Sequence, residues 1–336
     1  MMGLLARRAR ATAHGVADEL LTRLMGGPKL YADGFGSLTE LDTLVETIRT
    51  YDATVPPRSI QMRWGEDVRT ANATVRRGTF ESPAAAMLPR ETQTGHVELH
   101  LPRSAATGRV CLLLAATGEE GYALRRRLVA DLLREGVGSL LLENPYYGAR
   151  RPAGQTLSLV RTVRDQFAMN TATVDEARAL LRWLRDQGYV PGTSGYSQGG
   201  MMASFGAALS DFPVAAVPCA SGLRAAPIFT ENALQRRFDW GALAKAFGSE
   251  PEARAHFAAC LEPVDVGLFP PPRHPASAIL VGARYDGYIK PPEVEALHDH
   301  WAGSELRWVE TGHLTGAVLG KRAHLRAIVD AFDRLP

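Results

Sequence analysis

The sequence predicts an α/β fold in which helices flank a mostly parallel central sheet. Short apolar runs bounded by turn residues, at 110–116 and 139–142, are typical of strands buried on both faces of such a sheet. Stretches with helical spacing separate these runs, at 122–135 and 157–186. Alternating strands and helices favour parallel strands joined by right-handed crossovers.

The alternation continues on both sides of these segments, and one core domain with an insertion fits the 336 residues. Residues 94–102 alternate polar and apolar side chains, as a half-buried strand does. Other extended segments are expected at 59–63, 214–217, 278–281 and 306–309, and a final helix at 319–335.

The composition is that of an ordinary globular protein, with 46% hydrophobic and 22% charged residues. The net charge of +2 argues against a nucleic-acid partner. Three cysteines give no disulfide framework and favour a reducing compartment, so we expect a cytoplasmic protein. No apolar run reaches about 18 residues, so no transmembrane helix is expected.

Residues 1–27 are expected to form a separate N-terminal arm. Three arginines near its start precede a one-sided stripe of apolar residues at helical spacing. This pattern predicts an amphipathic helix that packs on the body of the protein. The alternative is a basic helix that makes peripheral membrane contact through residues 1–25. Gly26-Gly27-Pro28 ends the arm, so the main domain is expected at 28–336.

Residues 222–275 form a connection between two predicted strands that is much longer than usual. Helical pieces are expected at about 231–247 and 251–261, followed by a proline-rich exit at 270–272. We interpret this insertion as a cap over the functional site. Its apolar side chains could line an acyl pocket or form the core of the cap: Phe229, Phe238, Trp240, Leu243, Phe247 and Phe257.

The candidate nucleophile is Ser197, in the pentapeptide Gly195-Tyr196-Ser197-Gln198-Gly199. This G-x-S-x-G pattern is typical of a sharp strand-to-helix turn in the α/β-hydrolase fold, which exposes the serine Oγ. Glycines two residues on either side avoid the clashes that a Cβ would cause. The turn also directs the backbone N–H of Gln198 into the site, as one half of an oxyanion hole. A glycine-rich turn with an incidental serine is the structural alternative.

The other two members of a catalytic triad should follow in the order acid, then histidine. Asp286 stands at the end of a predicted strand, before a turn glycine, and would orient the histidine. His313 is expected in a short loop after the next strand, where it can point back to Ser197. A turn-forming aspartate and a loop histidine bonded to backbone are the alternatives. The remaining downstream histidines are expected in helices or a linker: His256, His274, His298, His300 and His324.

The second oxyanion donor should come from the loop 115–121, after the first buried strand. The backbone N–H of Thr117 or of Gly118 would serve, and the sequence does not choose between them. The resulting site would transfer an acyl group from an ester or thioester to water without metal or organic cofactor. An acyltransferase, an amidase or peptidase, and a silent binding or scaffold protein on the same fold remain as alternatives.

One segment carries a family resemblance. Residues 142–152, Leu-Glu-Asn-Pro-Tyr-Tyr-Gly-Ala-Arg-Arg-Pro, nearly match a stretch of the α/β-hydrolase domain-containing protein 18 family. The similarity spans about residues 28–330 and includes Tyr31-Ala-Asp-Gly-Phe-Gly36. It implies a hydrolase fold, acyl-ester activity with lipid or small-molecule ester substrates, and a triad at Ser197, Asp286 and His313.

The resemblance also suggests pocket residues. Tyr146, Tyr147 and Arg150 would line the pocket, or else brace the turn after the strand. Tyr196, beside the candidate nucleophile, is a further candidate for substrate contact. The chain departs from the family pattern at Glu119-Glu120, which replaces Asp-His, and at Gln198, which replaces methionine. We expect the second change to be harmless, because only the backbone N–H of Gln198 would act.

Overall fold

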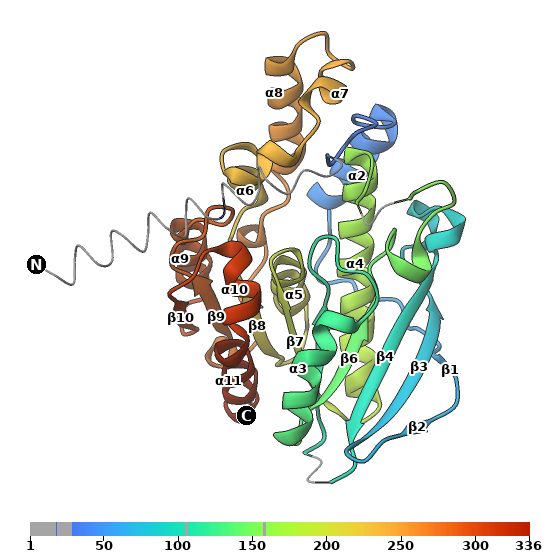
Figure 1. The fold of residues 1–336 in the computed structure, drawn as a ribbon, viewed down its shortest axis with the longest axis vertical. Coiled ribbons are helices and arrows are strands. Elements are labelled where there is room, and N and C mark those ends of the chain that lie inside the picture. The colour runs from blue at the N-terminus through green and yellow to red at the C-terminus, as the bar shows by residue number, and fades with distance from the viewer. Residues whose placement is uncertain (1–17, 19–28, 105–106, 157–158) are drawn as a thin grey trace, which may run out of the picture.

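The computed structural model describes Asp18 and residues 29–104, 107–156 and 159–336. In these residues ten strands form one sheet with the order β1-β3-β4-β6-β5-β7-β8-β9-β10, and β2 pairs with β3 (Figure 1). In this order, every neighbouring pair from β6 to β10 is parallel. The pairs β1–β3, β2–β3, β3–β4 and β4–β6 are antiparallel. The predicted mostly parallel α/β fold is therefore confirmed. The strands are β1 Arg63–Trp64, β2 Val68–Arg69, β3 Ala73–Glu81, β4 Thr94–Pro102, β5 Arg109–Leu114, β6 Gly138–Leu142, β7 Val190–Tyr196, β8 Ala215–Cys219, β9 Ile279–Ala283 and β10 Glu305–Val309.

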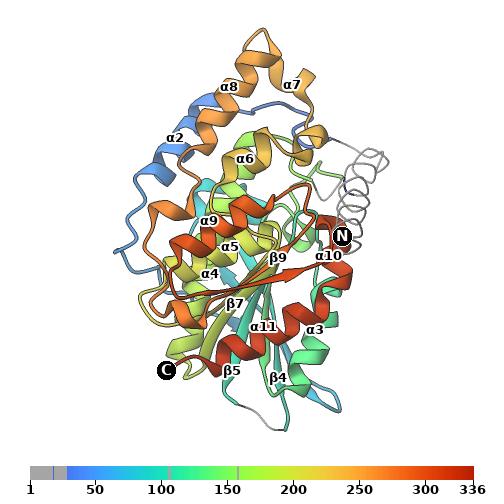
Figure 2. The ribbon, with the colours of Figure 1, turned by 90° about the vertical axis from the view of Figure 1, so that its left-hand side faces the viewer.

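Helices cover both faces of the sheet, with α3 and α11 on one face and α4 and α5 on the other (Figures 1 and 2). None of the helices in the described part of the chain combines the length and apolarity needed to cross a membrane. The helices are α2 Leu38–Arg49, α3 Ala123–Arg134, α4 Val163–Asp186, α5 Gln198–Ala208, α6 Ala225–Thr230, α7 Trp240–Ala244, α8 Glu250–Leu261, α9 Pro291–His300, α10 His313–Leu319 and α11 Lys321–Asp333.

The central strands show why their sequences are unbroken apolar runs. Successive side chains of a strand point to opposite faces of a sheet. Leu112 and Leu114 of β5 pack in the core cluster that contains α4 and α5, whereas Cys111 and Leu113 pack with α3 and α11. Both faces are buried, so no position on the strand can be polar without losing apolar burial, worth about 25 cal/mol per Å².

Several segments differ from the sequence-based expectation, and helix α2 and the short strand β2 are among those not predicted. The antiparallel strand β3 was not predicted. β7 includes Pro191-Gly192, although proline is uncommon in the interior of a sheet. Pairing between β7 and β8 begins at Gly192, so the missing N–H of Pro191 removes no hydrogen bond between these two strands. The final helix expected at 319–335 is α11, but a separate helix α10 precedes it, so His313 is the first residue of α10 instead of a loop residue.

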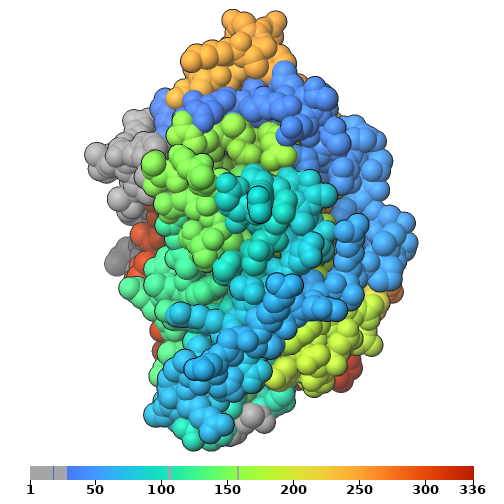
Figure 3. All heavy atoms as spheres, turned by 90° about the vertical axis from the view of Figure 1, so that its right-hand side faces the viewer, coloured from blue at the N-terminus to red at the C-terminus, as the bar shows by residue number. Residues whose placement is uncertain are grey.

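The insertion between β8 and β9 contains α6, α7 and α8, and its outer part projects beyond one end of the sheet (Figure 1). Figure 3 shows this part in orange beside the dark blue segment that contains α2, and α8 packs against α2. The ring of Phe238 packs at a tilt against that of Tyr31 with centroids 4.9 Å apart, and the ring of Phe257 lies 5.7 Å from the same ring. The aromatic side chains of the insertion thus join it to the first residues of the main domain.

Arg150 lies in the core instead of the pocket. Its guanidinium is completely buried and forms a bidentate ion pair with Glu176 of α4, with N–O distances of 2.6 and 2.7 Å. It also donates to the carbonyl oxygens of Thr92 and Glu143, each at 2.8 Å. Arg150 therefore ties the segment after β6 to α4 and to the turn before β4.

We expect Arg150→Met to destabilise the protein by about 3–5 kcal/mol, because it leaves the buried carboxylate of Glu176 without a counter-charge. The free energy of unfolding in urea measures the effect. The matched control is Arg161→Met, which breaks a half-exposed pair with Asp33 and should cost less than about 1 kcal/mol. Equal losses in the two variants would contradict the assignment of Arg150 as a core contact.

A second polar contact connects β7, the strand that precedes Ser197, to α11. Ser194 of β7 donates its hydroxyl proton to the carbonyl oxygen of Val217 at 2.6 Å. His324 of α11 lies 2.6 Å from the same hydroxyl oxygen, so its Nε2 must carry a proton and donate. Burial lowers the pKa of His324 to about 4, because the charged ring would lose its hydration.

His324 should make stability depend on pH in a defined direction. Between its unfolded value of 6.5 and about 4, the unfolded chain binds a proton that the folded chain does not. The free energy of unfolding should therefore fall as the pH is lowered through this range, by up to about 1.4 kcal/mol per pH unit from this residue. His324→Gln keeps an N–H donor and does not titrate, so urea unfolding of this variant should show a shallower pH dependence. An unchanged slope would show that His324 titrates normally.

Candidate active site

At the turn between β7 and α5, which carries Ser197, the backbone at the start of α5 lies in direct contact with the backbone of neighbouring strands. Ser197 has a φ of 57° and a ψ of −117°, a strained conformation for a residue with a side chain. A Cβ on Gly195 would lie 2.4 Å from the carbonyl carbon of Gly199, and one on Gly199 would lie 2.4 Å from the carbonyl oxygen of Leu114. A Cβ on Gly200 would lie 2.4 Å from the carbonyl oxygen of Cys219. The glycines are required because larger residues would separate the helix from the strands.

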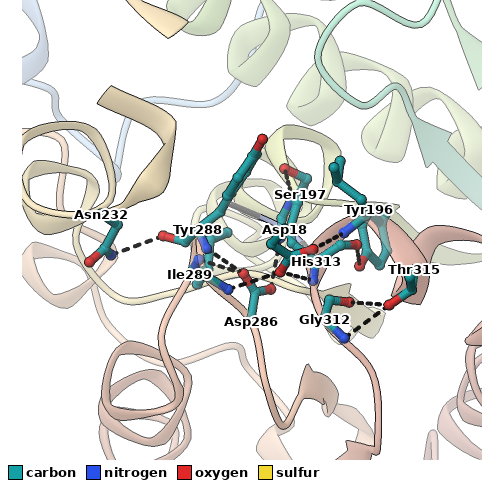
Figure 4. A network of polar contacts seen from close by, with 12 residues as sticks. Asp18, Tyr196, Ser197, Asn232, Asp286, Tyr288, Ile289, Gly312, His313 and Thr315 are labelled. Carbon is teal, nitrogen blue, oxygen red and sulfur yellow. Dashed lines mark hydrogen bonds and ion pairs between the residues drawn. The ribbon is translucent and has the colours of Figure 1, made fainter. Parts of the chain in front are cut away.

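Ser197, His313 and Asp286 form one hydrogen-bonded chain, shown in Figure 4. The Oγ of Ser197 is 2.9 Å from Nε2 of His313, and Nδ1 of His313 is 2.7 Å from Oδ2 of Asp286. Asp286 follows β9, and His313 follows β10 at the start of α10. The structure thus brings together the three residues that the sequence nominates, from the carboxyl ends of three parallel strands.

Neighbouring groups fix the acid and the imidazole ring. Oδ1 of Asp286 accepts hydrogen bonds from the backbone N–H groups of Tyr288 and Ile289, both at 2.8 Å. The ring of Tyr288 stacks on the imidazole of His313, with centroids 4.6 Å apart and an interplanar angle of 24°. The side-chain amide of Asn232, in the insertion, donates to the carbonyl oxygen of Tyr288 at 2.9 Å. The insertion therefore contacts the residue that covers the histidine.

Tyr196 supports His313 from the other side. Its hydroxyl donates to the carbonyl oxygen of His313 at 2.5 Å. Burial raises the pKa of Tyr196, and the nearby carboxylate of Asp286 raises it further, so the hydroxyl stays a donor. Tyr196 is not among the residues that line the pocket. In the structure its hydroxyl holds the histidine, and the substrate contact suggested for Tyr196 stays a prediction.

The loop after β5 places Thr117 near the nucleophile. Thr117 lines the same pocket as Ser197 and Gln198, and its Oγ1 donates to Oε1 of Gln198 at 3.0 Å. Among the described residues, none accepts a hydrogen bond from the backbone N–H of Thr117 or of Gln198. Gly118 is not part of the lining. Of the two expected second donors, the geometry favours Thr117.

Glu119 and Glu120, where the chain departs from the family pattern, brace this loop. Oε2 of Glu119 accepts from the backbone N–H of Ala116 at 3.2 Å, and its Oε1 pairs with the buried Arg125 at 2.7 Å. Arg125 in turn donates to carbonyl oxygens at the ends of β5 and β6, both at 2.7 Å. Glu120 forms an ion pair with Arg151. The substituted residues therefore position the loop that carries Thr117.

A cavity with an empty volume of about 1150 Å³, part of which opens to solvent, begins at Ser197. One wall follows α5 and its C-cap. The residues there are Gln198, Met201, Met202, Phe205 and Leu209, so the wall extends for about 16 Å at 1.5 Å per residue. The insertion supplies most of the facing wall, through Ala225, Ile228, Phe229, Leu234, Phe257, Leu261, Val264 and Phe269. The cavity is thus long and predominantly apolar.

Polar groups form a small patch on this apolar surface. The side-chain amide of Gln198 donates to Oδ1 of Asn170 at 2.7 Å, and that of Gln166 donates to the same oxygen at 3.0 Å. The hydroxyls of Tyr31 and Thr171, also in the lining, are buried without a hydrogen-bond partner among the described residues. The side chain of Gln198 therefore links the Thr117 loop to α4, a role that the backbone argument from sequence missed.

The residues suggested by the resemblance lie elsewhere. Neither Tyr146, Tyr147 nor Arg150 is in the pocket lining. The hydroxyl of Tyr146 donates to Asp165 at 3.0 Å, and the ring of Tyr147 is completely buried in the core. These residues brace the turn after β6, which was the structural alternative. Of the insertion residues expected at an acyl pocket, Phe229 and Phe257 line it, while Phe238, Trp240, Leu243 and Phe247 pack in or against the neighbouring core cluster.

Three solved structures with a similar architecture are described as esterases. Acetyl xylan esterase 1 from Thermoanaerobacterium sp. JW/SL YS485 has a TM-score of 0.58 at 13% identity, with 90% of this chain and 96% of that chain covered. An acetyl xylan esterase from Paenibacillus sp. R4 has a TM-score of 0.57 at 16% identity, covering 89% and 96%. A cold-adapted esterase from an Arctic intertidal metagenomic library has a TM-score of 0.51 at 16% identity, covering 82% and 100%. At these identities the likeness establishes the α/β-hydrolase fold.

The family follows from the sequence itself. The model of the family described as alpha/beta hydrolase domain containing 18 matches residues 28–256 and 248–334. The two matched segments overlap, and together they span most of the 336 residues. The resemblance noted in the sequence is therefore confirmed, and this chain belongs to the alpha/beta hydrolase domain containing 18 family.

Proposed function

We propose that this protein is a serine hydrolase that cleaves carboxylic esters of apolar acids through an acyl-enzyme. The observation that carries the proposal is the hydrogen-bonded chain from Ser197 through His313 to Asp286, at one end of a long apolar cavity. A serine hydroxyl is a weak nucleophile unless a base accepts its proton, and Nε2 of His313 lies within reach of that proton.

The first half of the reaction forms the acyl-enzyme. His313 accepts the proton of Ser197 as Oγ attacks the ester carbonyl carbon, and Asp286 stabilises the imidazolium that results. The backbone N–H groups of Gln198 and Thr117 donate to the oxyanion, each worth about 3 kcal/mol in the transition state. His313 then gives its proton to the leaving alcohol as the carbon–oxygen bond breaks.

Water completes the reaction by the same steps in reverse. His313 accepts a proton from water, whose oxygen attacks the acyl carbon, and then returns a proton to Oγ of Ser197 as the acid leaves. The same acyl-enzyme could pass its acyl group to an alcohol, which would make the protein an acyltransferase. No described contact favours an acceptor alcohol over water, so we retain hydrolysis.

The shape of the cavity supports an apolar acyl group. Its wall along α5 begins at Gln198, beside the nucleophile, and ends at Leu209. Burying each methylene of an acyl chain contributes about 0.8 kcal/mol. The buried hydroxyls of Tyr31 and Thr171 lack partners in the described part of the protein, so a hydrogen-bonding group of the substrate near them would remove the cost of leaving them unsatisfied.

The test of the nucleophile is labelling of the purified full chain with a fluorophosphonate, which reacts with activated serines. We expect stoichiometric labelling of the wild type and none of Ser197→Ala, with kcat for ester hydrolysis reduced by about 10⁴-fold or more. Ser204→Ala is the matched control, because this serine lies on the same helix α5, buried. Folded wild-type protein that resists labelling, or a labelled Ser197→Ala variant, would contradict the proposal.

The test of the acyl pocket is a series of bulky substitutions along α5. Met201→Trp should restrict the enzyme to the shortest acyl esters, Phe205→Trp should allow intermediate chains, and Leu209→Trp should affect only the longest. The expected measurement is kcat/KM for esters that differ only in acyl length, with a loss of about tenfold for every one or two methylenes that are excluded. Fluorophosphonate labelling of each variant controls for an intact nucleophile. The same length preference in all three variants would place the acyl group elsewhere.

A further inference from the structure

Asp18 is the residue of the N-terminal arm that the structure describes, and it lies beside the candidate triad (Figure 4). Its side chain has an exposed fraction of 0%. Oδ2 accepts hydrogen bonds from the backbone N–H groups of His313 at 2.6 Å and Gly287 at 3.1 Å, and Oδ1 accepts from Leu314 at 3.1 Å. Bonds from backbone N–H groups to a carboxylate are charge-assisted and stronger than neutral ones.

These contacts connect the two segments that carry the acid and the histidine. Gly287 directly follows Asp286 in the turn after β9, whereas His313 and Leu314 begin α10. The negative charge of Asp18 also lies at the positive end of α10, where it is favourable. One carboxylate therefore fixes the spacing between the acid-bearing turn and the helix end from which His313 projects.

The glycines beside the triad fit this interpretation. A Cβ on Gly312, which precedes His313, would lie 2.7 Å from Oδ2 of Asp18, and a Cβ on Gly287 would lie 3.3 Å from the Asp18 Cβ. Gly312 has a φ of −84°, which any residue adopts. Its backbone therefore does not require glycine, but the close approach of Asp18 does.

We propose that Asp18 is a positioning residue for the reaction, which holds the backbone of His313 so that its ring stays in line between Ser197 and Asp286. The inference rests on the proposed function. Tyr196 holds the carbonyl oxygen of His313, and Asp18 holds its N–H, so the two contacts together determine where the imidazole points. A displacement of about 1 Å in a reacting group can reduce the rate by about 100-fold.

The first test is Asp18→Asn in the full chain, which preserves the shape of the side chain and removes its charge. We expect kcat for ester hydrolysis to fall by about 10- to 100-fold with KM nearly unchanged, and Asp18→Glu to recover part of the loss. The matched control is Asp239→Asn, which removes a carboxylate that caps α7 by accepting from Ala242 at 3.0 Å. If Asp18→Asn keeps the wild-type kcat, or loses no more than Asp239→Asn, Asp18 does not position His313.

A double-mutant cycle separates this role from a general loss of stability. Gly312→Ala should lower kcat in the wild type, because the added Cβ displaces the Asp18 carboxylate. In an Asp18→Ala background, Gly312→Ala should lower kcat little further, since the carboxylate that the added Cβ would displace is absent. If the double variant loses kcat by the product of the two single losses, the two residues act independently and the proposed contact is wrong.

Hydrogen exchange distinguishes a failure of this inference from a failure of the proposed function. The amides of His313 and Leu314 should exchange faster in Asp18→Asn than in the wild type, whether or not the protein hydrolyses esters. Faster exchange in a protein that fluorophosphonate does not label would support the contact and reject the hydrolase. Unchanged exchange in a protein that is labelled would support the hydrolase and reject the role of Asp18.

Discussion

The structure depends on a close approach between backbones at the turn that carries Ser197. Helix α5 can reach the sheet only because Gly195, Gly199 and Gly200 have no Cβ. A Cβ added at any of these three positions would lie 2.4 Å from a neighbouring backbone atom. This contact keeps Ser197 in a conformation that it would not adopt alone. It also directs the first N–H groups of α5 at the place where an oxyanion would form. The candidate nucleophile, the candidate oxyanion site and one pocket wall therefore all depend on this contact.

His313 is held in a different manner, by side chains that come from separate parts of the fold. Tyr288 covers its ring, Tyr196 binds its carbonyl oxygen and Asp18 binds its N–H. None of these contacts involves the bonds that the imidazole makes to Ser197 and Asp286. The ring is thus oriented through its backbone and its faces, which leaves Nδ1 to bond Asp286 and Nε2 to face Ser197.

The sequence predicts the central strands and the order of the three nominated residues because these features are local. The strands at 110–116 and 139–142 are unbroken apolar runs, since both faces are buried, and the serine has a spaced glycine motif. β3 has a mixed burial pattern and was missed. Asp18 has no local signal, because its partner His313 is 295 residues away. The sequence left the place of Arg150 open between the pocket and the turn after β6, because its partner Glu176 is visible only in the fold.

The two walls of the cavity differ in how freely they can vary. The wall on α5 belongs to the helix that directly follows Ser197, so a change in its packing is transmitted to this candidate nucleophile. The facing wall comes from the insertion between β8 and β9, which takes no part in the turn around Ser197. Substitutions at Ile228, Phe229 or Phe257 can therefore reshape the cavity while the turn stays intact. The insertion is therefore the part of this fold in which the shape of the cavity can vary independently of the turn that holds Ser197.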